Sequence, residues 1–202
     1  MISTLDDALG WLERGGALSL TPNGALPSLV EQVAGEPVKG SWWKHPRGGD
    51  IFQLASALDD HPDVLAVKLV RGKVVFLHRA LWPALLRVVS DPLWREPRVS
   101  RLTLPAAKLL KSVEKCGRVR MDELAEELDA PTRKRLTRDR EALEKALLVH
   151  SGQLHTASGK HATVLTRWTT VAEERGVAPA TTDYADALAK LEAACRGEPI
   201  GA

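Results

Sequence analysis

Residues 63–78 read Asp-Val-Leu-Ala-Val-Lys-Leu-Val-Arg-Gly-Lys-Val-Val-Phe-Leu-His. Two runs rich in β-branched and large apolar residues flank a short Arg-Gly-Lys segment. Such runs favour extended strands, and a glycine between them favours a tight turn. The sequence therefore predicts a β-hairpin whose tip carries the cations of Arg71 and Lys73.

The same order of elements occurs twice in the chain. In the first half, helical patterns at 26–34 and 50–60 precede the hairpin, and a further helix at 81–89 follows it. The corresponding helices and strands of the second half are expected at 104–115, 121–128, 133–147, 148–156 and 161–168. Helices followed by a two-stranded hairpin are the elements of a winged helix. We therefore predict an α+β fold, mainly α with small β-hairpins, in which tandem winged helix-turn-helix domains are followed by a C-terminal helix.

The breaks between these patterns predict the domain organisation. Residues 1–92 are expected to form an N-terminal winged-helix-like domain with a leader helix, and residues 103–175 a second winged-helix domain. The segment 93–102 contains proline and several arginines and is expected to be a linker. Residues 176–202 are expected to form the C-terminal helix and tail.

Bulk composition narrows the class of protein. The net charge of the 202 residues is only +2, so binding to a nucleic acid would depend on where cations cluster. No stretch approaches the roughly 18 apolar residues of a membrane span, which predicts a cytoplasmic protein with no membrane partner. Cys116 and Cys195 fit neither a zinc spacing nor a disulfide framework, and we expect no metal and no cofactor.

The densest cluster of cations lies at residues 132–140, at the start of the expected recognition helix. Five basic residues and one acidic residue give this segment a local net charge of +4. Contacts to base edges are expected from Arg135 and Thr137, because guanidinium and hydroxyl groups can hydrogen-bond to bases. Contacts to phosphates are expected from Arg133, Lys134 and Arg138. The alternative is a solvated helix face with ordinary ion pairs, and the acidic segment 122–129 weighs against a DNA footprint.

The tips of the two hairpins add further cations. Arg71 and Lys73 in the first tip and Lys160 in the second are expected to contact phosphates. His161, beside Lys160, is expected to contact a phosphate or to enter a minor groove. A metal site built from the histidines of the second hairpin is disfavoured, because strand alternation puts His150 and His155 on opposite faces. Contacts within the turn are the alternative for these histidines.

Residues 40–49 read Gly-Ser-Trp-Trp-Lys-His-Pro-Arg-Gly-Gly. Trp42 and Trp43, flanked by Lys44 and Arg47, have the chemistry to stack on unpaired bases or to enter a base step. We therefore include these four residues in the expected DNA-binding set. The alternative is that both tryptophans anchor a loop rich in glycine and proline onto the core.

Four segments carry a resemblance to a known group: 26–29, 40–43, 68–76 and 155–161. On these, the chain resembles bacterial winged-helix proteins that are similar at a distance to the AlkZ-related relatives of the winged-helix DNA glycosylases. The resemblance implies tandem winged helices and DNA association. The glycosylases use a Gln-x-Gln or Gln-x-Asp motif, whereas the nearest string here, Gln153-Leu154-His155, differs at its third position.

We therefore expect a non-enzymatic protein that binds DNA, preferably duplex, as a regulator or a DNA-repair accessory. No Gly-rich phosphate loop, nucleophile elbow or HExxH pattern occurs in the sequence. The first alternative is a minimal glycosylase-like enzyme in which Trp42 or Trp43 fills the gap left by an extruded base and Gln153 or His155 positions water. The second is a scaffold that binds a protein partner or a second copy of itself.

Overall fold

The computed structural model describes residues 1–126, 128–155 and 161–201. These residues form a mainly α structure with two small antiparallel sheets of three strands each, which confirms the α+β class. The chain divides into two compact units, residues 1–85 with 185–202 and residues 86–184. The C-terminal segment 185–202 therefore belongs to the same unit as the N-terminus.

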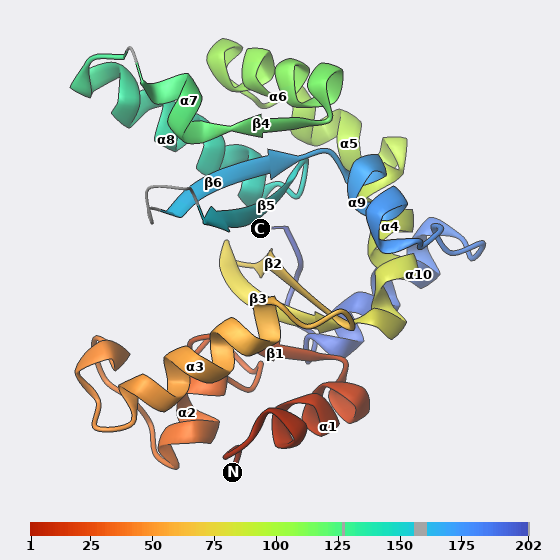
Figure 1. Ribbon diagram of the computed structural model, residues 1–202. Helices are drawn as coiled ribbons and strands as arrows, with labels where there is room; N and C mark the ends of the chain where they lie inside the picture. Colours follow the sequence, from red (N-terminus) through yellow and green to blue (C-terminus); the bar gives the residue numbers. More distant parts are fainter. Residues whose placement is uncertain (127, 156–160, 202) are drawn as a thin grey trace. The chain divides into compact units, whose positions relative to one another are not determined.

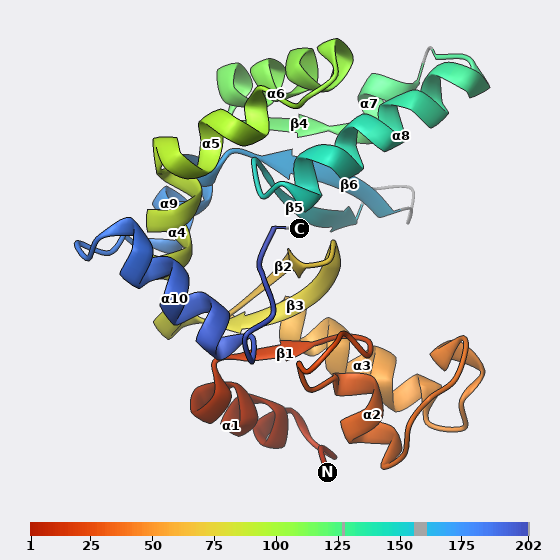
Figure 2. The same cartoon turned by 180° about the vertical axis from the view of Figure 1, so that it is seen from behind.

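The N-terminal part of the first unit combines helices with a three-stranded sheet and short 3-10 turns. Its elements in chain order are α1 (Leu5–Gly15), β1 (Ala17–Ser19), α2 (Leu29–Ala34), η1 (Trp42–Lys44), α3 (Gly48–Asp59), β2 (Val64–Val70), β3 (Lys73–His78) and η2 (Arg79–Leu81). The order of strands in the sheet is β1-β3-β2. Helices α1, α2 and α3 lie on one side of this sheet (Figures 1 and 2).

The expected hairpin at 63–78 is confirmed by β2 and β3. Val64 pairs with His78 and Leu65 with Leu77 in an antiparallel register. At the tip, Arg71 and Gly72 both have positive φ angles, 51° and 66°. A two-residue turn with positive φ at both positions matches the twist of the flanking strands, so the tip geometry fits a tight hairpin.

Local sequence explains where the helices of the first unit begin and end. Thr4 and Asp7 form a capping box at the start of α1, in which each side chain accepts a hydrogen bond from the other residue's backbone N–H. Ser28 caps α2 by accepting from the N–H of Glu31, and Gly35 ends it in the left-handed conformation. The apolar faces of these helices pack on the sheet around Leu12, Leu29, Val33, Ile51, Leu58 and Phe76.

The second unit repeats the order of helices and strands seen in the first. Its elements are α5 (Pro92–Val99), α6 (Leu104–Cys116), β4 (Arg118–Arg120), α7 (Met121–Ala125), α8 (Ala130–Lys145), β5 (His150–His155), β6 (His161–Thr166) and α9 (Trp168–Arg175). The order of strands in its sheet is β4-β6-β5, and α6, α7 and α8 lie on one side of it (Figure 1). Its core is built around Leu109, Leu110, Val113, Leu143, Leu148 and Leu165.

Both units therefore have the order helix, strand, helix, helix, strand, strand, with the first strand paired to the third. The sequence pattern does not reveal β1, and α1, the expected leader helix, precedes β1 as α6 precedes β4 in the second unit. Helix α4 (Trp82–Ser90) follows the first sheet, and α10 (Tyr184–Ala194) precedes the C-terminal segment.

Several expected boundaries differ from the structure. Most of the expected linker at 93–102 is helical, because it overlaps α5, which Asp91 caps by accepting from the N–H of Leu93. Helix α8 begins at Ala130 and ends at Lys145, whereas the pattern predicts 133–147. The expected turn at 157–160 lies outside the described residues. Within the part of the chain that the structure describes, no helix is both long enough and apolar enough to cross a bilayer.

The two cysteines lie in different environments. Cys116 is exposed, and Cys195 is buried. Burial raises the pKa of the Cys195 thiol to about 12, and the nearby carboxylates of Glu192 and Glu198 contribute to this rise. A neutral, buried thiol is a poor nucleophile.

At pH 8 we expect a chromogenic thiol reagent to modify one thiol per native chain quickly and the second only after unfolding in denaturant. Rapid modification of both in the native protein would contradict this assignment.

Candidate nucleic-acid interface

Helix α8 begins where Asp129 caps it. The Asp129 carboxylate accepts a hydrogen bond from the backbone N–H of Thr132 at 2.9 Å, and Pro131 occupies the first turn, where its missing N–H costs nothing. Hydrogen bonds from the side chain and the backbone of Thr132 lower the pKa of Asp129. The cap therefore stays ionised at neutral pH and holds the basic first turns of α8 in a helix.

Two cations in the basic segment 132–140 of α8 have neither a hydrogen-bond partner nor an ion-pair partner among the described residues. Lys134 and Arg138 are exposed and four positions apart, so they lie on the same face of the helix. Arg133 and Arg135 are also exposed, but Arg133 donates to the carbonyl of Ala125 at 3.1 Å and Arg135 to the hydroxyl of its helix neighbour Thr132, also at 3.1 Å. Within the basic segment, Lys134 and Arg138 are therefore the cations most available to an anion.

Thr137 and Arg140 in the same segment form hydrogen bonds within the unit. The Thr137 hydroxyl donates to the carbonyl of Arg133 at 3.0 Å, so its proton is already used. Arg140 is the fifth cation of the basic segment, but its side chain is mostly buried beside Glu144 and donates to Thr163. The surface cation cluster thus consists of four residues rather than five.

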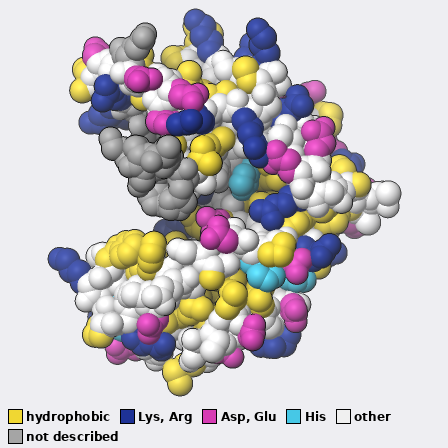
Figure 3. Space-filling view, viewed as in Figure 1, with side chains coloured by type: hydrophobic (Ala, Val, Ile, Leu, Met, Phe, Trp, Pro, Cys, Tyr) yellow, Lys and Arg dark blue, Asp and Glu magenta, His cyan; other side chains and the backbone are white. Residues whose placement is uncertain are grey.

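The acidic residues before α8 are partly neutralised. Arg120 contacts the Asp122 carboxylate at 2.6 Å and the Glu123 carboxylate at 3.0 Å. The bond to Asp122, followed by the contact with Glu123, raises the pKa of Arg120. In turn, the Arg120 guanidinium lowers the pKa of Asp122. Basic and acidic side chains lie side by side over α7 and α8 in the space-filling view (Figure 3). The pairs with Arg120 reduce the repulsion that α7 would exert on a phosphate near α8.

The cations at the first hairpin tip have partners inside their own unit. Arg71 forms an ion pair with Glu198 at 2.7 Å, and the Lys73 ammonium donates to the carbonyl of Pro22 at 2.9 Å. The other carboxylate oxygen of Glu198 accepts from the N–H of Ala25, and Ile200 bridges to Val70 on the hairpin. The C-terminal segment is thus held against this tip. Any phosphate contact by Arg71 would compete with Glu198.

The second hairpin is described only in its two strands. Lys160 lies outside the described residues, and His161 is the first residue of β6, where it pairs with His155 in the register of the sheet. The ring of His150 packs edge-on against Trp168 with centroids 5.6 Å apart. No cluster of potential metal ligands occurs among the described residues.

The Trp42-Trp43 segment is half anchored and half exposed. Trp42 packs partly against the core of the first unit, which agrees with the anchoring alternative. Trp43 is 61% exposed, and its ring stacks on that of Trp42 with centroids 4.1 Å apart and planes inclined by 22°. Phe52 on α3 is 47% exposed and lies 5.3 Å from the Trp43 ring. Hydrophobic side chains gather over this part of the unit (Figure 3).

Phe52 is not among the DNA-binding residues expected from the sequence. Its neighbours Ile51, Leu54 and Leu58 form the buried stripe of α3, and Phe52 lies outside that stripe. A large aromatic residue off the apolar face of an amphipathic helix is the signal that would have identified it.

The cations beside these rings differ in availability. Arg47 contacts the Asp50 carboxylate at 3.0 Å and also donates to the carbonyl of Val33. Lys44 is exposed and has no side-chain partner within the described residues. Of the two cations expected here, Lys44 is therefore the one free to meet an anion.

Gly48, the first residue of α3, lies close to the backbone of Trp42 and Trp43. A Cβ atom at Gly48 would lie 3.0 Å from the carbonyl oxygen of Trp42 and 3.1 Å from that of Trp43, whereas a Cβ at Gly49 would meet nothing within 4 Å. We expect Gly48→Ala to lower the free energy of unfolding by about 1–2 kcal/mol through overpacking. Gly49→Ala is the matched control and is expected to raise it by about 0.5–1 kcal/mol, because alanine restricts the unfolded chain. Urea unfolding of both variants checks this, and equal effects would contradict the role assigned to Gly48.

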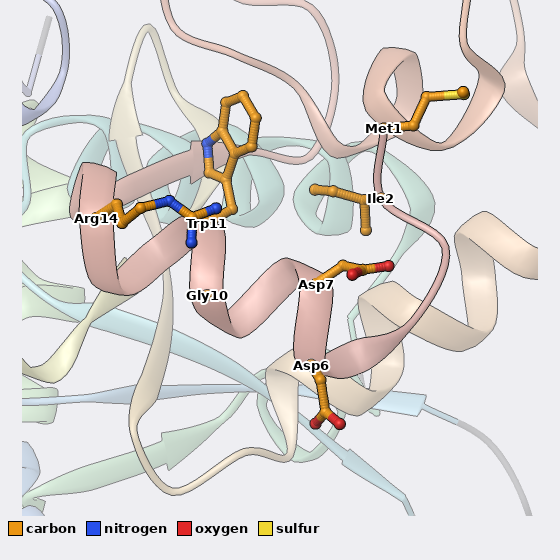
Figure 4. Close-up of a pocket in the computed structure, with 7 residues that line it drawn as sticks. All are labelled: Met1, Ile2, Asp6, Asp7, Gly10, Trp11 and Arg14. Carbon is orange, nitrogen blue, oxygen red and sulfur yellow. The ribbon is translucent and has the colours of Figure 1, made fainter.

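A shallow pocket of about 280 Å³ lies beside α1. Its lining residues are Met1, Ile2, Asp6, Asp7, Gly10, Trp11 and Arg14 (Figure 4). The Asp7 carboxylate accepts from the N–H groups of Ser3 and Thr4, which lower its pKa, so this carboxylate is engaged in the capping box of α1. No catalytic arrangement of side chains follows from the residues that line this pocket.

Comparisons with known proteins identify no relative of this chain. No family model, no curated protein and no solved structure matches the chain. The function therefore has to be inferred from the residues and their geometry alone.

Proposed function

We propose that each unit is a winged helix and that the protein binds duplex DNA through the N-terminal half of α8. The observation that carries this proposal is the pair of exposed cations, Lys134 and Arg138, with no partner among the described residues, on one face of that helix. The element order of the second unit supports it, because in a winged helix the third helix is the one that enters the major groove.

The chemistry of the surface suits a phosphodiester backbone. Lys134 and Arg138 would contact phosphates, and Arg133 would add a third contact while keeping its bond to Ala125. Arg135 would reach a base edge by exchanging its bond to Thr132, since a guanidinium presents several donors. Arg71 and Lys73 would contribute less, because both have partners within their own unit.

We propose a binding role without chemistry, as a regulator or a DNA-repair accessory. In the glycosylase-like alternative Gln153 would position water; on β5 its amide N–H donates to the hydroxyl of Thr163 on β6 at 3.4 Å. DNA binding also implies a location in the compartment that holds the DNA, which agrees with the cytoplasmic location expected from the sequence.

Fluorescence anisotropy with a labelled mixed-sequence duplex of about 20 base pairs tests the proposal. Three phosphate contacts give a slope of about −2.7 in a plot of log affinity against log salt, so raising salt from about 50 to 200 mM should weaken binding roughly 40-fold. Absence of binding at the lower salt concentration would overturn the proposed function. In that case a protein partner or self-association becomes the next hypothesis to test.

A further inference from the structure

We propose that Trp43, Phe52 and Lys44 form a binding site for an unpaired nucleotide of a DNA strand. This inference rests on the proposed DNA-binding function and names a second kind of DNA contact, located in the first unit. It concerns a base that is not engaged in a pair, because only such a base exposes its ring face to a protein side chain.

The geometry of the rings is the first support. Trp42 is partly buried against the core of the unit and stacks on Trp43, so the Trp43 ring is supported on one face. The ring of Phe52, whose centroid is 5.3 Å from that of Trp43, extends the aromatic surface onto the first turns of α3. Rings fixed before binding lose little side-chain entropy when a base stacks on them.

The exposure of these rings is the second support. Trp43 is 61% exposed and Phe52 is 47% exposed, and the two are in contact, so they form a continuous apolar surface rather than isolated residues. A continuous exposed apolar surface commonly marks an interaction site.

The charges around the rings are the third support. The segment 35–52 has two acidic side chains: Asp50 forms an ion pair with Arg47 at 3.0 Å, and Glu36 contacts the ring of His45 at 3.3 Å. Lys39 and Lys44 are exposed and have no side-chain partner among the described residues. With three cations (Lys39, Lys44 and Arg47) against two carboxylates, the segment that carries Trp43 and Phe52 has a formal net charge of 3 − 2 = +1.

An unpaired nucleotide matches both properties. Its base offers a π face for stacking, and its phosphate offers a negative charge to Lys44 or Lys39. A purely apolar partner, such as a second copy of the chain, would use the rings but would leave the two lysines without a counter-charge. The combination of rings and lysines favours the nucleotide.

Anisotropy with two labelled ligands tests this site, using an oligothymidine of about fifteen nucleotides and the mixed-sequence duplex. Thymidine strands do not pair with themselves, so every base is free to stack. We expect Trp43→Ala to weaken oligothymidine binding about tenfold and to leave duplex binding within about twofold of the wild type. Trp43→Phe should recover part of the loss, because it retains an aromatic face.

Leu93→Ala is the matched control, since Leu93 is an exposed apolar residue on another helix, at 68% exposure. It should bind both ligands as the wild type does. The inference is overturned if the wild type does not bind oligothymidine, if Trp43→Ala binds it as tightly as the wild type, or if Trp43→Ala weakens both ligands equally. Loss of a wild-type dimer in Trp43→Ala, seen by sedimentation without any oligothymidine binding, would assign the surface to a second copy and also overturn it. Absence of duplex binding by the wild type is a separate result, which overturns the proposed function through α8.

Discussion

Replacing Lys134 and Arg138 together by alanine should weaken binding to duplex DNA by about tenfold or more at low salt. Each lost phosphate contact removes about 0.9 from the magnitude of the salt slope, so the double variant should show a slope near −0.9 instead of about −2.7. The physical reason is that these two side chains are exposed and have no partner among the described residues. Replacing them breaks no bond to those residues, and the change in affinity therefore reports on the DNA contact itself.

A charge-matched control separates a local contact from a general effect of net charge. Lys111 on α6 and Lys190 on α10 are exposed and likewise have no side-chain partner in the described part of the chain. Lys111→Ala combined with Lys190→Ala removes the same two positive charges from other helices, and it should retain nearly wild-type affinity and slope. An equal loss in both double variants would mean that binding depends on total charge and that α8 is not the interface.

Trp94→Ala is expected to lower the free energy of unfolding of the second unit by about 3–5 kcal/mol. Trp94 is 2% exposed, and its indole N–H donates to the carbonyl of Ala146 at 3.2 Å, at the end of α8. The Arg98 guanidinium lies 3.3 Å from the centre of its ring. Alanine would leave a cavity, would remove the hydrogen bond to the Ala146 carbonyl and would remove the aromatic ring on which the Arg98 guanidinium lies.

Denaturant unfolding followed by circular dichroism measures this effect, with two companion variants. Trp94→Phe keeps most of the apolar volume and loses the donor, so it should cost less than half as much as Trp94→Ala. Leu93→Ala alters the adjacent residue, which is 68% exposed, and should change stability by less than about 0.5 kcal/mol. If Trp94→Ala were as mild as Leu93→Ala, α5 would not be part of the packed unit.

The elements with strong local signals could be predicted from the sequence. The hairpin formed by β2 and β3 follows from its β-branched runs and its glycine turn, and α6 follows from its apolar period, its Thr103 cap and Gly117. Strand β1 has only three residues, too few for alternation to show, and its strand geometry depends on pairing with β3. The proline and arginines of α5 favour a linker in the sequence, although Asp91 followed by Pro92 is a recognisable helix start.

The candidate site was predictable only in part, for a physical reason. The basic run at the start of α8 is visible in the sequence, but the partners of its side chains are set by the fold. Glu198 lies 127 residues from Arg71, and no local pattern predicts their ion pair. The exposure of Trp43 likewise depends on how its ring is supported by Trp42, which adjacency in sequence does not determine. The DNA-binding role stays a prediction that the anisotropy experiments test, and the tandem winged helices likewise stay a prediction.

An NMR titration of the ¹⁵N-labelled chain with the mixed-sequence duplex would locate the DNA-binding surface residue by residue, through the shifts of backbone amides. We predict that the largest shift changes fall on the amides of residues 132–138 in α8, with smaller ones at Arg71 and Lys73. Changes confined to other parts of the chain, or no changes at concentrations where anisotropy reports binding, would contradict binding through α8.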